Sequence, residues 1–439
     1  MNISNYIKNE LLNWPNWING ILLRLNVFGG LVYGRGYGKF KMHLNKAAPE
    51  QLLIDSVNHS IQHVPYYRKK YGDLRIHSVN EFQKKIGFID KEEVMAHWDD
   101  FLVDGIDWSK VSTGTTGGTS GKPLKLVTPK NRYSWELAYM HSMWGKAGWH
   151  YHIRGVIRNH DLKGRDYAIN PIMKEVIFDP HKMSNTYVKT ICETLRHFGV
   201  KYVTAYPSNA FQFCKLCAKQ KLDISFIKAF LCGSEGITDE QKAFFSRYNI
   251  HILTWYGHSE KLILGSNDTH SWNISIEPNY GFCELIGKDN QPLTEMGEIG
   301  EMTGTSFYNR YFPLIRYKTG DYAELAQAGK KLVLSNIMGR WDKTLIYKID
   351  GTTTSLTILN LHGDIYEHID GIQYVQDKVG YLKVTIIRNE QYTQTDEEFI
   401  VNHLATAMGG KQYVKITYVE QLVFQPNGKF LPLISKLNN

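Results

Sequence analysis

Apolar residues recur at helical spacing in the middle of the chain. Val188, Ile191, Leu195 and Phe198 fall on one face of a helix, and Gly199 follows them as a stop signal. The pattern therefore predicts a helix that buries one face and ends near residue 199.

Strands and helices alternate after this point. The segments VKYVTA (200–205), IKAFLC (227–232) and HILTWY (251–256) are rich in β-branched, aromatic and other apolar residues, as strands are. Pro207-Ser208 predicts the start of a helix after the first strand, and Thr238 with Gln241 predicts a capping box before a second helix. Strands that alternate with helices in this way predict a parallel sheet.

Each predicted strand ends in a polar turn that contains glycine or proline. The turns are Tyr206-Pro207-Ser208, Gly233-Ser234-Glu235 and Gly257-His258-Ser259-Glu260. Ligands of open α/β sheets bind at the carboxyl ends of the strands. We therefore expect these turns to converge on one crevice.

The two ends of the chain have different patterns. The N-terminal part, to about Phe101, is predicted to be mostly helical, whereas the segments YLKVTIIR (381–388) and VKITYVEQLVF (414–424) alternate like half-buried strands. Between these two strand segments, Thr395 and Glu398 predict a capping box at the start of a helix. The fold class is thus α/β, with a large N-terminal domain (1–340) of mostly parallel sheet layers and helices, and a small α+β C-terminal domain (341–439).

Composition indicates a globular protein but does not identify its ligand. Of 439 residues, 43% are hydrophobic and 21% are charged, which is typical of a globular chain. The net charge of +8 is compatible with anionic ligands, a membrane surface or nucleic acid. The basic residues are scattered rather than grouped, so we expect no nucleic-acid partner.

Five cysteines do not suggest a disulfide framework and fit the reducing cytoplasm. Cys214 and Cys217 form a C-x-x-C pair, but no second pair follows at zinc-site spacing. We predict that both are core thiols of an amphipathic helix.

The apolar run 18–34 is too short to span a bilayer and is interrupted by Arg24. It also starts late for a signal peptide. We interpret it as a packed helix and turn, with peripheral contact to a membrane surface as the alternative.

The stretch VSTGTTGGTSGKPLKL (111–126) is so rich in glycine and hydroxyl residues that we expect neither helix nor strand there. Glycines let a backbone approach an anion closely, while N–H groups, hydroxyls and a lysine donate to it. It is no Walker A loop, because Gly117 and Gly121 bracket three residues rather than four and Pro123 follows Lys122. A phosphate-binding loop and a solvated surface loop remain the alternatives.

Several motifs occur in a fixed order along the chain: TGGTSGKPL (116–124), YGHSE (256–260), PLIRYKTGD (313–321), GRWD (339–342) and NGKF (427–430). Their order and spacing resemble the adenylate-forming ligase superfamily, which includes the AMP-forming acyl-CoA synthetases. Within it the chain resembles the phenylacetate–CoA ligase branch, and there most of all the capsular-polysaccharide-associated members. The resemblance covers nearly the whole chain after about residue 50.

The resemblance implies sites for ATP and Mg²⁺. It assigns the ATP phosphates to the glycine-rich loop, adenine to the turns after two strands, and the ribose hydroxyls to an aspartate; an arginine would contact ribose or phosphate. The implied nucleotide-binding residues are Thr116, Gly118, Thr119, Ser120, Gly121, Lys122, Gly233, Ser234, Glu235, Tyr256, Gly257, Asp321 and Arg340. Glu260 would hold Mg²⁺, as a carboxylate at a strand end can. STGTTG just upstream competes for the alignment, so the register within the loop stays open.

The resemblance also implies how the C-terminal domain acts. Lys429 would bridge the carboxylate substrate and the α-phosphate, and Asp342 would be the hinge about which a mobile C-terminal domain turns. Tyr206, Pro207, Ser208 and His258 would line the acid site. For His258 a packed or capping role is the alternative, and the aromatic stretch 135–149 could form either that pocket or core.

The implied activity is adenylation of a carboxylic acid, an aryl acid being favoured by the aromatic stretch, and transfer of the acyl group to CoA. One alternative is an ATP-dependent amide ligase of cell-surface polysaccharide (capsule) biosynthesis. The other is an inactive binding or scaffold homologue. ATP and Mg²⁺ are the expected cofactors, the enzyme would be cytoplasmic, and monomer and dimer are both compatible with the sequence.

Overall fold

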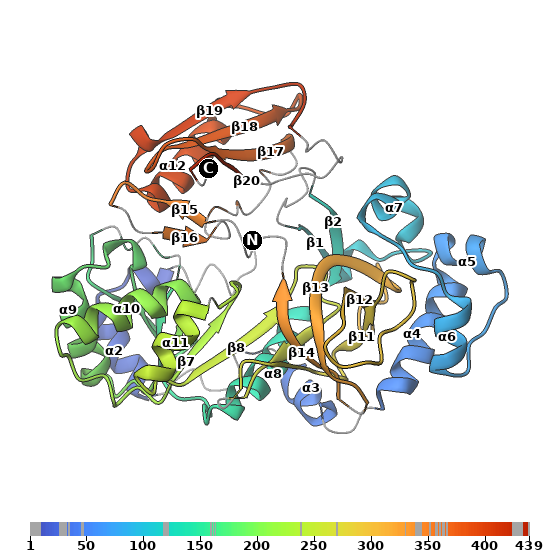
Figure 1. The fold of residues 1–439 in the computed structure, drawn as a ribbon, viewed down its shortest axis with the longest axis horizontal. Coiled ribbons are helices and arrows are strands. Elements are labelled where there is room, and N and C mark those ends of the chain that lie inside the picture. The colour runs from blue at the N-terminus through green and yellow to red at the C-terminus, as the bar shows by residue number, and fades with distance from the viewer. Residues whose placement is uncertain are drawn as a thin grey trace. The chain divides into compact units, whose positions relative to one another are not determined.

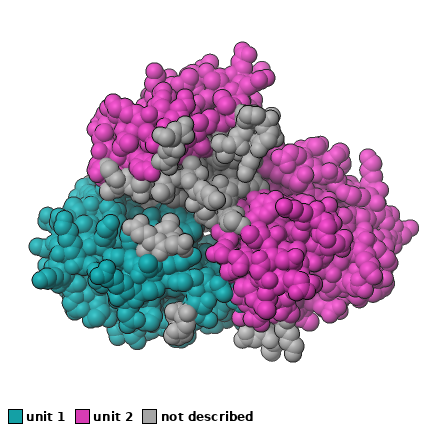
Figure 2. All heavy atoms as spheres, viewed as in Figure 1, with its two compact units in different colours: residues 1–46, 131–256, 265–275 teal, residues 47–130, 257–264, 276–439 magenta. Residues whose placement is uncertain are grey.

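The fold is described from a computed structural model. It covers residues 10–25, 33, 36–44, 48–116, 123–158, 160, 162, 164–237, 239–268, 271–329, 331–338, 345–350, 353–355, 359, 361, 365, 368–423 and 433–437. Contacts divide the chain into two compact units, coloured separately in Figure 2. Unit 1 comprises residues 1–46, 131–256 and 265–275, and unit 2 comprises 47–130, 257–264 and 276–439.

The sheet of unit 1 is mostly parallel, as the alternation of strands and helices predicted. Its strands lie in the order β8-β7-β6-β3-β5-β4. They are β3 (Arg154–Ile157), β4 (Ala168–Asn170), β5 (Glu175–Phe178), β6 (Tyr202–Ala205), β7 (Ala229–Gly233) and β8 (Ile252–Gly257). Strands β5, β3, β6, β7 and β8 run parallel, and β4 pairs antiparallel with β5.

Helices pack against this sheet; α9, α10 and α11 lie beside one another in Figure 1. The helices of unit 1 are α2 (Asn16–Leu25), α3 (Tyr37–His43), α8 (Arg132–Lys146), η4 (Pro180–Lys182), α9 (Asn185–His197), α10 (Pro207–Lys219) and α11 (Asp239–Arg247). Helix α9 is the predicted one: it buries Val188, Ile191 and Leu195, and Gly199 has the positive φ (62°) that suits a glycine stop. Thr238 of the predicted capping box lies outside the described residues.

Cys214 and Cys217 are core thiols, as predicted. Cys192, Cys214, Cys217 and Cys232 are buried in the core of unit 1. The sulfur atoms of Cys192 and Cys217 lie 3.8 Å apart and are not bonded, and all five cysteines of the chain are free thiols.

Unit 2 begins with helices and contains an antiparallel sheet. The helices are α4 (Pro49–His63), α5 (Pro65–Tyr71), α6 (Val79–Lys85), α7 (Lys91–Ala96), η2 (Trp98–Phe101) and η3 (Trp108–Lys110). The sheet has the order β11-β12-β13-β14, formed by β11 (Gly281–Ile286), β12 (Ile299–Ser306), β13 (Tyr317–Gln327) and β14 (Val333–Met338). The short strands β9 (Leu264–Ser266) and β10 (Ile274–Ile276) lie where the chain passes from one unit to the other.

The C-terminal part of unit 2 is the predicted small α+β region. Its strands are β15 (Leu345–Tyr347), β16 (Thr353–Ser355), β17 (Ile369–Gln376), β18 (Leu382–Arg388), β19 (Val414–Tyr418) and β20 (Leu433–Ser435), with helices α12 (Gln394–Met408) and η7 (Lys411–Tyr413). Helix α12 lies against the sheet β19-β18-β17-β20, and Ile386, Ile400 and Leu404 belong to one buried cluster (Figure 1).

The predicted cap of this helix was wrong by two residues. Thr393, not Thr395, is the N-cap: its hydroxyl accepts from the Asp396 amide, and the Asp396 carboxylate accepts from the Thr393 amide. Thr393 and Asp396 have the same spacing of hydroxyl and carboxylate as the predicted pair, and the backbone at Thr393 is the one with extended geometry (φ −122°, ψ 170°).

The predicted absence of regular structure over 111–126 was also wrong in part. Val111–Thr115 forms β1, which pairs antiparallel with β2 (Lys125–Pro129) from Val111 opposite Pro129 to Thr115 opposite Lys125. Backbone pairing with Leu126 and Val127, both buried, outweighs the low strand propensity of the small residues.

The apolar run 18–34 begins in α2, as the predicted packed helix, while residues 26–32 and 34 lie outside the described part. Of the helices in the described ranges, none has the length and apolar character needed to cross a bilayer.

Candidate functional site

The carboxyl ends of the parallel strands in unit 1 bring two of the predicted turns together. Strand register places Ala205 beside Cys232, so Tyr206-Pro207-Ser208 and Gly233-Ser234-Glu235 leave the sheet side by side. Pro207 occupies the first turn of α10, where a missing N–H costs nothing. The Ser208 amide donates to Glu235 Oε2 (3.1 Å), so the carboxylate of one turn satisfies the helix start of the other.

A third strand end adds a residue that was not singled out from the sequence. Ile157 pairs with Ala205, so Arg158 emerges beside Tyr206, and the buried Asn209 side chain fixes this end by donating to the Ile157 carbonyl (3.2 Å). The Arg158 guanidinium lies over the Tyr206 ring, 4.5 Å from its centroid, and donates to Ser234 Oγ (3.1 Å). Arg158 was not predicted as a site residue, because a single basic residue after a short strand does not form a recognisable sequence motif.

Close packing shapes the turn after β7. Gly233 lies opposite Trp255 of β8, and a Cβ on Gly233 would be 2.2 Å from the indole atom Cε2. Ser234 has a positive φ (72°), which turns the chain sharply. Only glycine fits at position 233, and the strained serine presents its hydroxyl to Arg158. Tyr256, half-buried, and Gly257 complete β8.

In unit 2 the glycine-rich loop is closed by a hairpin. The Thr116 amide donates to the Leu124 carbonyl (2.9 Å), and the Leu124 amide donates to Thr116 Oγ1 (2.9 Å). The Asn309 side chain donates to the Val127 carbonyl (2.8 Å) and so anchors β2 to the body of the unit. The structure thus fixes the two ends of the loop. Residues 117–122, with the predicted Gly118, Thr119, Ser120, Gly121 and Lys122, lie outside the described part, as do Arg340, Asp342 and Lys429.

The segment after β8 holds a histidine and a carboxylate in one hydrogen-bonded group. His258 Nε2 accepts from the Ile263 amide (3.2 Å), and His258 Nδ1 lies 2.9 Å from Glu260 Oε2. Because an N–H can be accepted only by an unprotonated ring nitrogen, the proton of the neutral ring is on Nδ1 and is donated to Glu260. His258 therefore orients the Glu260 carboxylate, whose side chain is 15% exposed.

The same carboxylate reaches the strand that carries Asp321. The buried Tyr317 hydroxyl donates to Glu260 Oε1 at 3.4 Å. Tyr317 opens β13 and forms a parallel bridge with Ile89, which fixes its backbone. The motifs YGHSE and PLIRYKTGD, far apart in the sequence, therefore meet at Glu260 and Tyr317.

A bulge in β13 presents Asp321. Thr303 lies opposite Lys318 and Glu301 opposite Tyr322, so residues 319–321 face the single residue Met302. The bulge is held by Thr319 Oγ1, which donates to the Met302 carbonyl (2.7 Å), and by the Gly320 amide, which donates to Glu301 Oε1 (3.1 Å). Gly320 has a φ of 75° that suits glycine. Bulges redirect side chains next to binding sites, and this one places the half-buried Asp321 off the regular strand.

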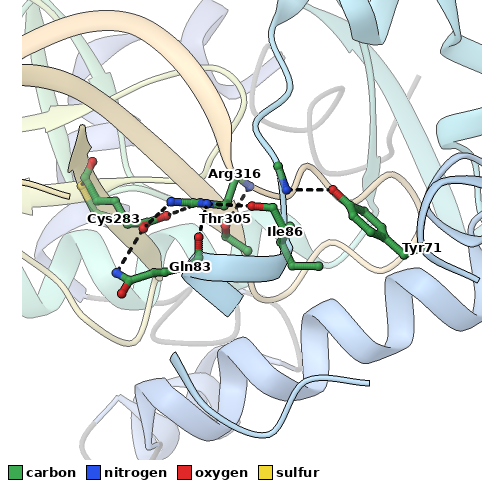
Figure 3. A network of polar contacts seen from close by, with 8 residues as sticks. Tyr71, Gln83, Ile86, Cys283, Thr305 and Arg316 are labelled. Carbon is green, nitrogen blue, oxygen red and sulfur yellow. Dashed lines mark hydrogen bonds and ion pairs between the residues drawn. The ribbon is translucent and has the colours of Figure 1, made fainter. Parts of the chain in front are cut away.

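The arginine of the motif PLIRYKTGD has a structural role. Arg316 and Glu284 form a buried pair, with Nε to Oε2 and Nη2 to Oε1 both at 3.0 Å. Figure 3 shows Arg316 between Gln83 and Ile86, whose carbonyls accept from its Nη1 at 2.9 and 2.7 Å. This network ties the segment around α6 to the start of β13 and so fixes Tyr317.

The aromatic stretch 135–149 is core. Trp135, Tyr139, Trp144 and Trp149 are all at most 5% exposed. His141 of helix α8 shares a hydrogen bond of 2.8 Å with the Tyr37 hydroxyl, in which either group can be the donor. Burial lowers the pKa of this histidine to about 3. Of the two alternatives for this stretch, burial favours core.

Known proteins resemble this chain in sequence. Residues 345–436 match the family model for the CapK C-terminal domain. The chain is 20% identical to Protein CapK of Staphylococcus aureus over 331 residues, which covers 72% of each chain. It is 23% identical to phenylacetate-coenzyme A ligase of Pseudomonas putida over 313 residues, 67% of this chain and 70% of the ligase.

Solved structures agree in fold. A crystal structure of 2-hydroxyisobutyryl-CoA ligase in complex with 2-HIB-AMP and CoA, in the thioesterification state, superposes with a TM-score of 0.53 at 14% identity, covering 88% of this chain and 89% of that one. The resemblance predicted from the ordered motifs, and the predicted fold class, are thereby confirmed.

Proposed function

We propose that this chain, which resembles the phenylacetate–CoA ligase branch of the adenylate-forming superfamily and has the superfamily's fold, is an AMP-forming carboxylate ligase. It would convert an acid and ATP to an acyl adenylate and pyrophosphate, and then transfer the acyl group to an acceptor. A carboxylate is a poor electrophile, and adenylation turns one of its oxygens into a good leaving group. The protein's part is to position the reactants and to stabilise charge.

One observation carries this proposal: Tyr317 of the motif PLIRYKTGD donates to Glu260 of the motif YGHSE, on the strand that presents Asp321 from a bulge. This contact joins two motifs for which we propose binding of Mg²⁺ and of ribose, and it supports a common nucleotide site. We infer that Glu260 is the carboxylate for Mg²⁺. One protein carboxylate fits this ion, because Mg²⁺ in nucleotide enzymes keeps water and phosphate oxygens as its other ligands.

Hydrogen bonds around Glu260 support that role. His258 donates to Oε2 and Tyr317 donates to Oε1, so these two hydrogen bonds hold the carboxylate in one orientation. Asp321, with two acceptor oxygens, suits two ribose hydroxyls, and the loop between Thr116 and Leu124 would hold the phosphates. Bound Mg²⁺ would neutralise phosphate charge.

We further infer that Lys429 serves adenylation and that the C-terminal domain, joined at Asp342, turns between the two half-reactions. Lys429 would offset the repulsion between the incoming carboxylate and the α-phosphate, which exists in the first transition state alone.

The acceptor in this proposal is CoA. The alternative is an amine, which would make the chain an amide ligase of capsule biosynthesis. The free thiols support a reducing compartment, the cytoplasm, for either activity.

Acid-dependent pyrophosphate release tests the proposal. The chain is incubated with ATP, Mg²⁺ and a panel of aryl, fatty and amino acids, and pyrophosphate is measured with each acid and without acid. We expect release with at least one acid, and product masses with CoA or with amines then name the acceptor. If no acid elicits release while ATP still protects the protein thermally, the chain is a binding or scaffold homologue and the ligase proposal fails.

A further inference from the structure

The surroundings of the Arg158 side chain differ from those of Arg154, which lies in β3, the strand that Arg158 directly follows. Arg154 is buried and internally neutralised: it pairs with Glu175 (2.5 Å), donates to Thr204 Oγ1 (3.1 Å) and lies over the ring of Trp144. Arg154 therefore stabilises the fold. Arg158, in contrast, is half-buried at the carboxyl end of the sheet, where α/β proteins bind ligands.

The contacts of Arg158 orient its guanidinium without neutralising it. Stacking on Tyr206 and the bond to Ser234 Oγ hold the planar group in one place. Among the described residues, no carboxylate lies within ion-pair distance of it. The nearby Glu235 carboxylate instead accepts from the Ser208 amide at the start of α10, where the helix dipole favours a negative charge.

An arginine that is held in place but not paired is suited to bind an anion. The guanidinium has five N–H donors, and of these the described structure uses one, on Ser234. Holding a charged side chain in one orientation costs conformational entropy in advance, so less is lost when a carboxylate or phosphate binds.

We propose that Arg158, with Tyr206 and Ser234, forms a specificity subsite for a second anionic group on the acid. This inference rests on the proposed function and extends it: the acid would be a dicarboxylate or another acid that carries an additional negative group. One carboxylate would be adenylated, and the other group would be recognised by Arg158. Neither the residues matched to the superfamily motifs nor the relatives' names point to this charge.

Pyrophosphate release in the absence of acceptor tests the subsite, because that half-reaction involves the acid and ATP alone. Acids are compared in pairs of matched carbon skeleton: hexanoate with adipate, and phenylacetate with 4-carboxyphenylacetate. We expect kcat/KM to favour the dianionic member. In Arg158→Gln the ratio of kcat/KM between the two members should fall about 10- to 100-fold, as the loss of a charge-assisted hydrogen bond implies.

A charge reversal gives the sharper result. Arg158→Glu should reverse the preference, so that 6-aminohexanoate is favoured over adipate. The matched control is Arg247→Gln, since Arg247 also lies over a tyrosine ring, that of Tyr248 (5.8 Å), but on the exposed surface of α11. Its ratio should equal that of the parent. Equilibrium binding of the same acid pairs, measured by calorimetry, provides a second readout that does not depend on turnover.

The outcomes separate the two proposals. If the parent releases pyrophosphate with acids but does not prefer dianionic ones, or if Arg158→Gln leaves the ratio unchanged, the subsite is overturned while the ligase function stands. A fall in kcat/KM for ATP that matches the fall for the acid would assign Arg158 to the nucleotide and would also overturn it. If no acid elicits release and none binds in the calorimeter, both proposals fail.

Discussion

Replacing Arg316 by methionine removes one partner of the buried pair that fixes the start of β13. Arg316 and Glu284 are each 3% exposed and share two hydrogen bonds of 3.0 Å. The guanidinium also serves the carbonyls of Gln83 and Ile86 and lies 4.1 Å from the centroid of Phe88. Methionine is a close apolar match in length but can replace none of the polar contacts.

The expected loss of stability follows from the buried polar groups that lose their partner when Arg316 is replaced. Breaking a buried ion pair from one side costs about 3–5 kcal/mol, because the remaining charge stays buried without its partner. The two orphaned carbonyls add about 1 kcal/mol each. We therefore expect Arg316→Met to lower the free energy of unfolding of this sheet by about 5–7 kcal/mol. Replacing Glu284 as well, in Arg316→Met/Glu284→Met, should recover most of that loss, since no buried charge then remains.

The loss should depend on pH with a definite sign. Burial raises the pKa of Glu284, and Arg316 opposes that rise. Without Arg316 the pKa of the folded state moves further above the unfolded value, about 4.3. A carboxyl whose folded pKa is raised contributes its full stability below the unfolded pKa and loses it as pH rises through the folded pKa. The free energy of unfolding of the variant should therefore be lower at pH 8 than at pH 5. It should fall with pH at a limiting slope of about 1.4 kcal/mol per pH unit.

Hydrogen exchange of amides in β11, β12 and β13 measures the effect where it occurs, and urea unfolding measures it globally. The control is Arg68→Met, which breaks the exposed pair of Arg68 and Asp104, with side chains 47% and 48% exposed, and should cost at most about 1 kcal/mol. If Arg316→Met costs no more than this control, or if its cost is the same at pH 5 and pH 8, the pair does not hold the strand and the reasoning is refuted.

Three further variants test the assigned roles. Asp321→Ala should raise the KM for ATP more than the KM for the acid, measured by pyrophosphate release, since its proposed partners are the ribose hydroxyls; an unchanged ATP dependence would return Asp321 to a turn residue. Glu260→Ala should shift the Mg²⁺ titration of the same reaction to higher concentration, because a metal ligand is lost, and a curve that overlays the parent's would count against that role. Lys429→Ala should lower acyl-adenylate formation by a factor on the order of 100 or more, as removal of one charge-stabilising donor does, while transfer from synthetic acyl-AMP to the acceptor continues near the parent's rate; equal loss in both half-reactions would indicate a structural part.

Much of the fold could be predicted because the signals are local. Helix α9 was predicted from Val188, Ile191 and Leu195, and the parallel strands from short apolar runs that end in polar turns. The hairpin β1–β2 was missed because its stability comes from pairing with Leu126 and Val127 rather than from the strand propensity of the glycine, serine and threonines of β1.

The site was less accessible to sequence reasoning than the fold. Motif order supplied Glu260 and Asp321, but the contact that joins their motifs is made by the Tyr317 hydroxyl, which looks like any core tyrosine in the sequence. Arg158 was missed for a similar reason: its importance arises from strand register, which sets it beside Tyr206. Register is a property of two segments together, so a pattern within one segment cannot reveal it.

The close packing of Gly233 against Trp255 also restricts how this chain could evolve. A larger residue at position 233 meets the indole at 2.2 Å, so that exchange is blocked as a first step. Shrinking Trp255 first opens a cavity, and truncation of a packed tryptophan costs about 3–5 kcal/mol, which is a large part of a typical domain's stability. Each single step passes through a poorly folded intermediate, whichever comes first. The two positions are therefore expected to change together or not at all, and a library that randomises both at once should recover folded pairs that no sequence of single substitutions would reach.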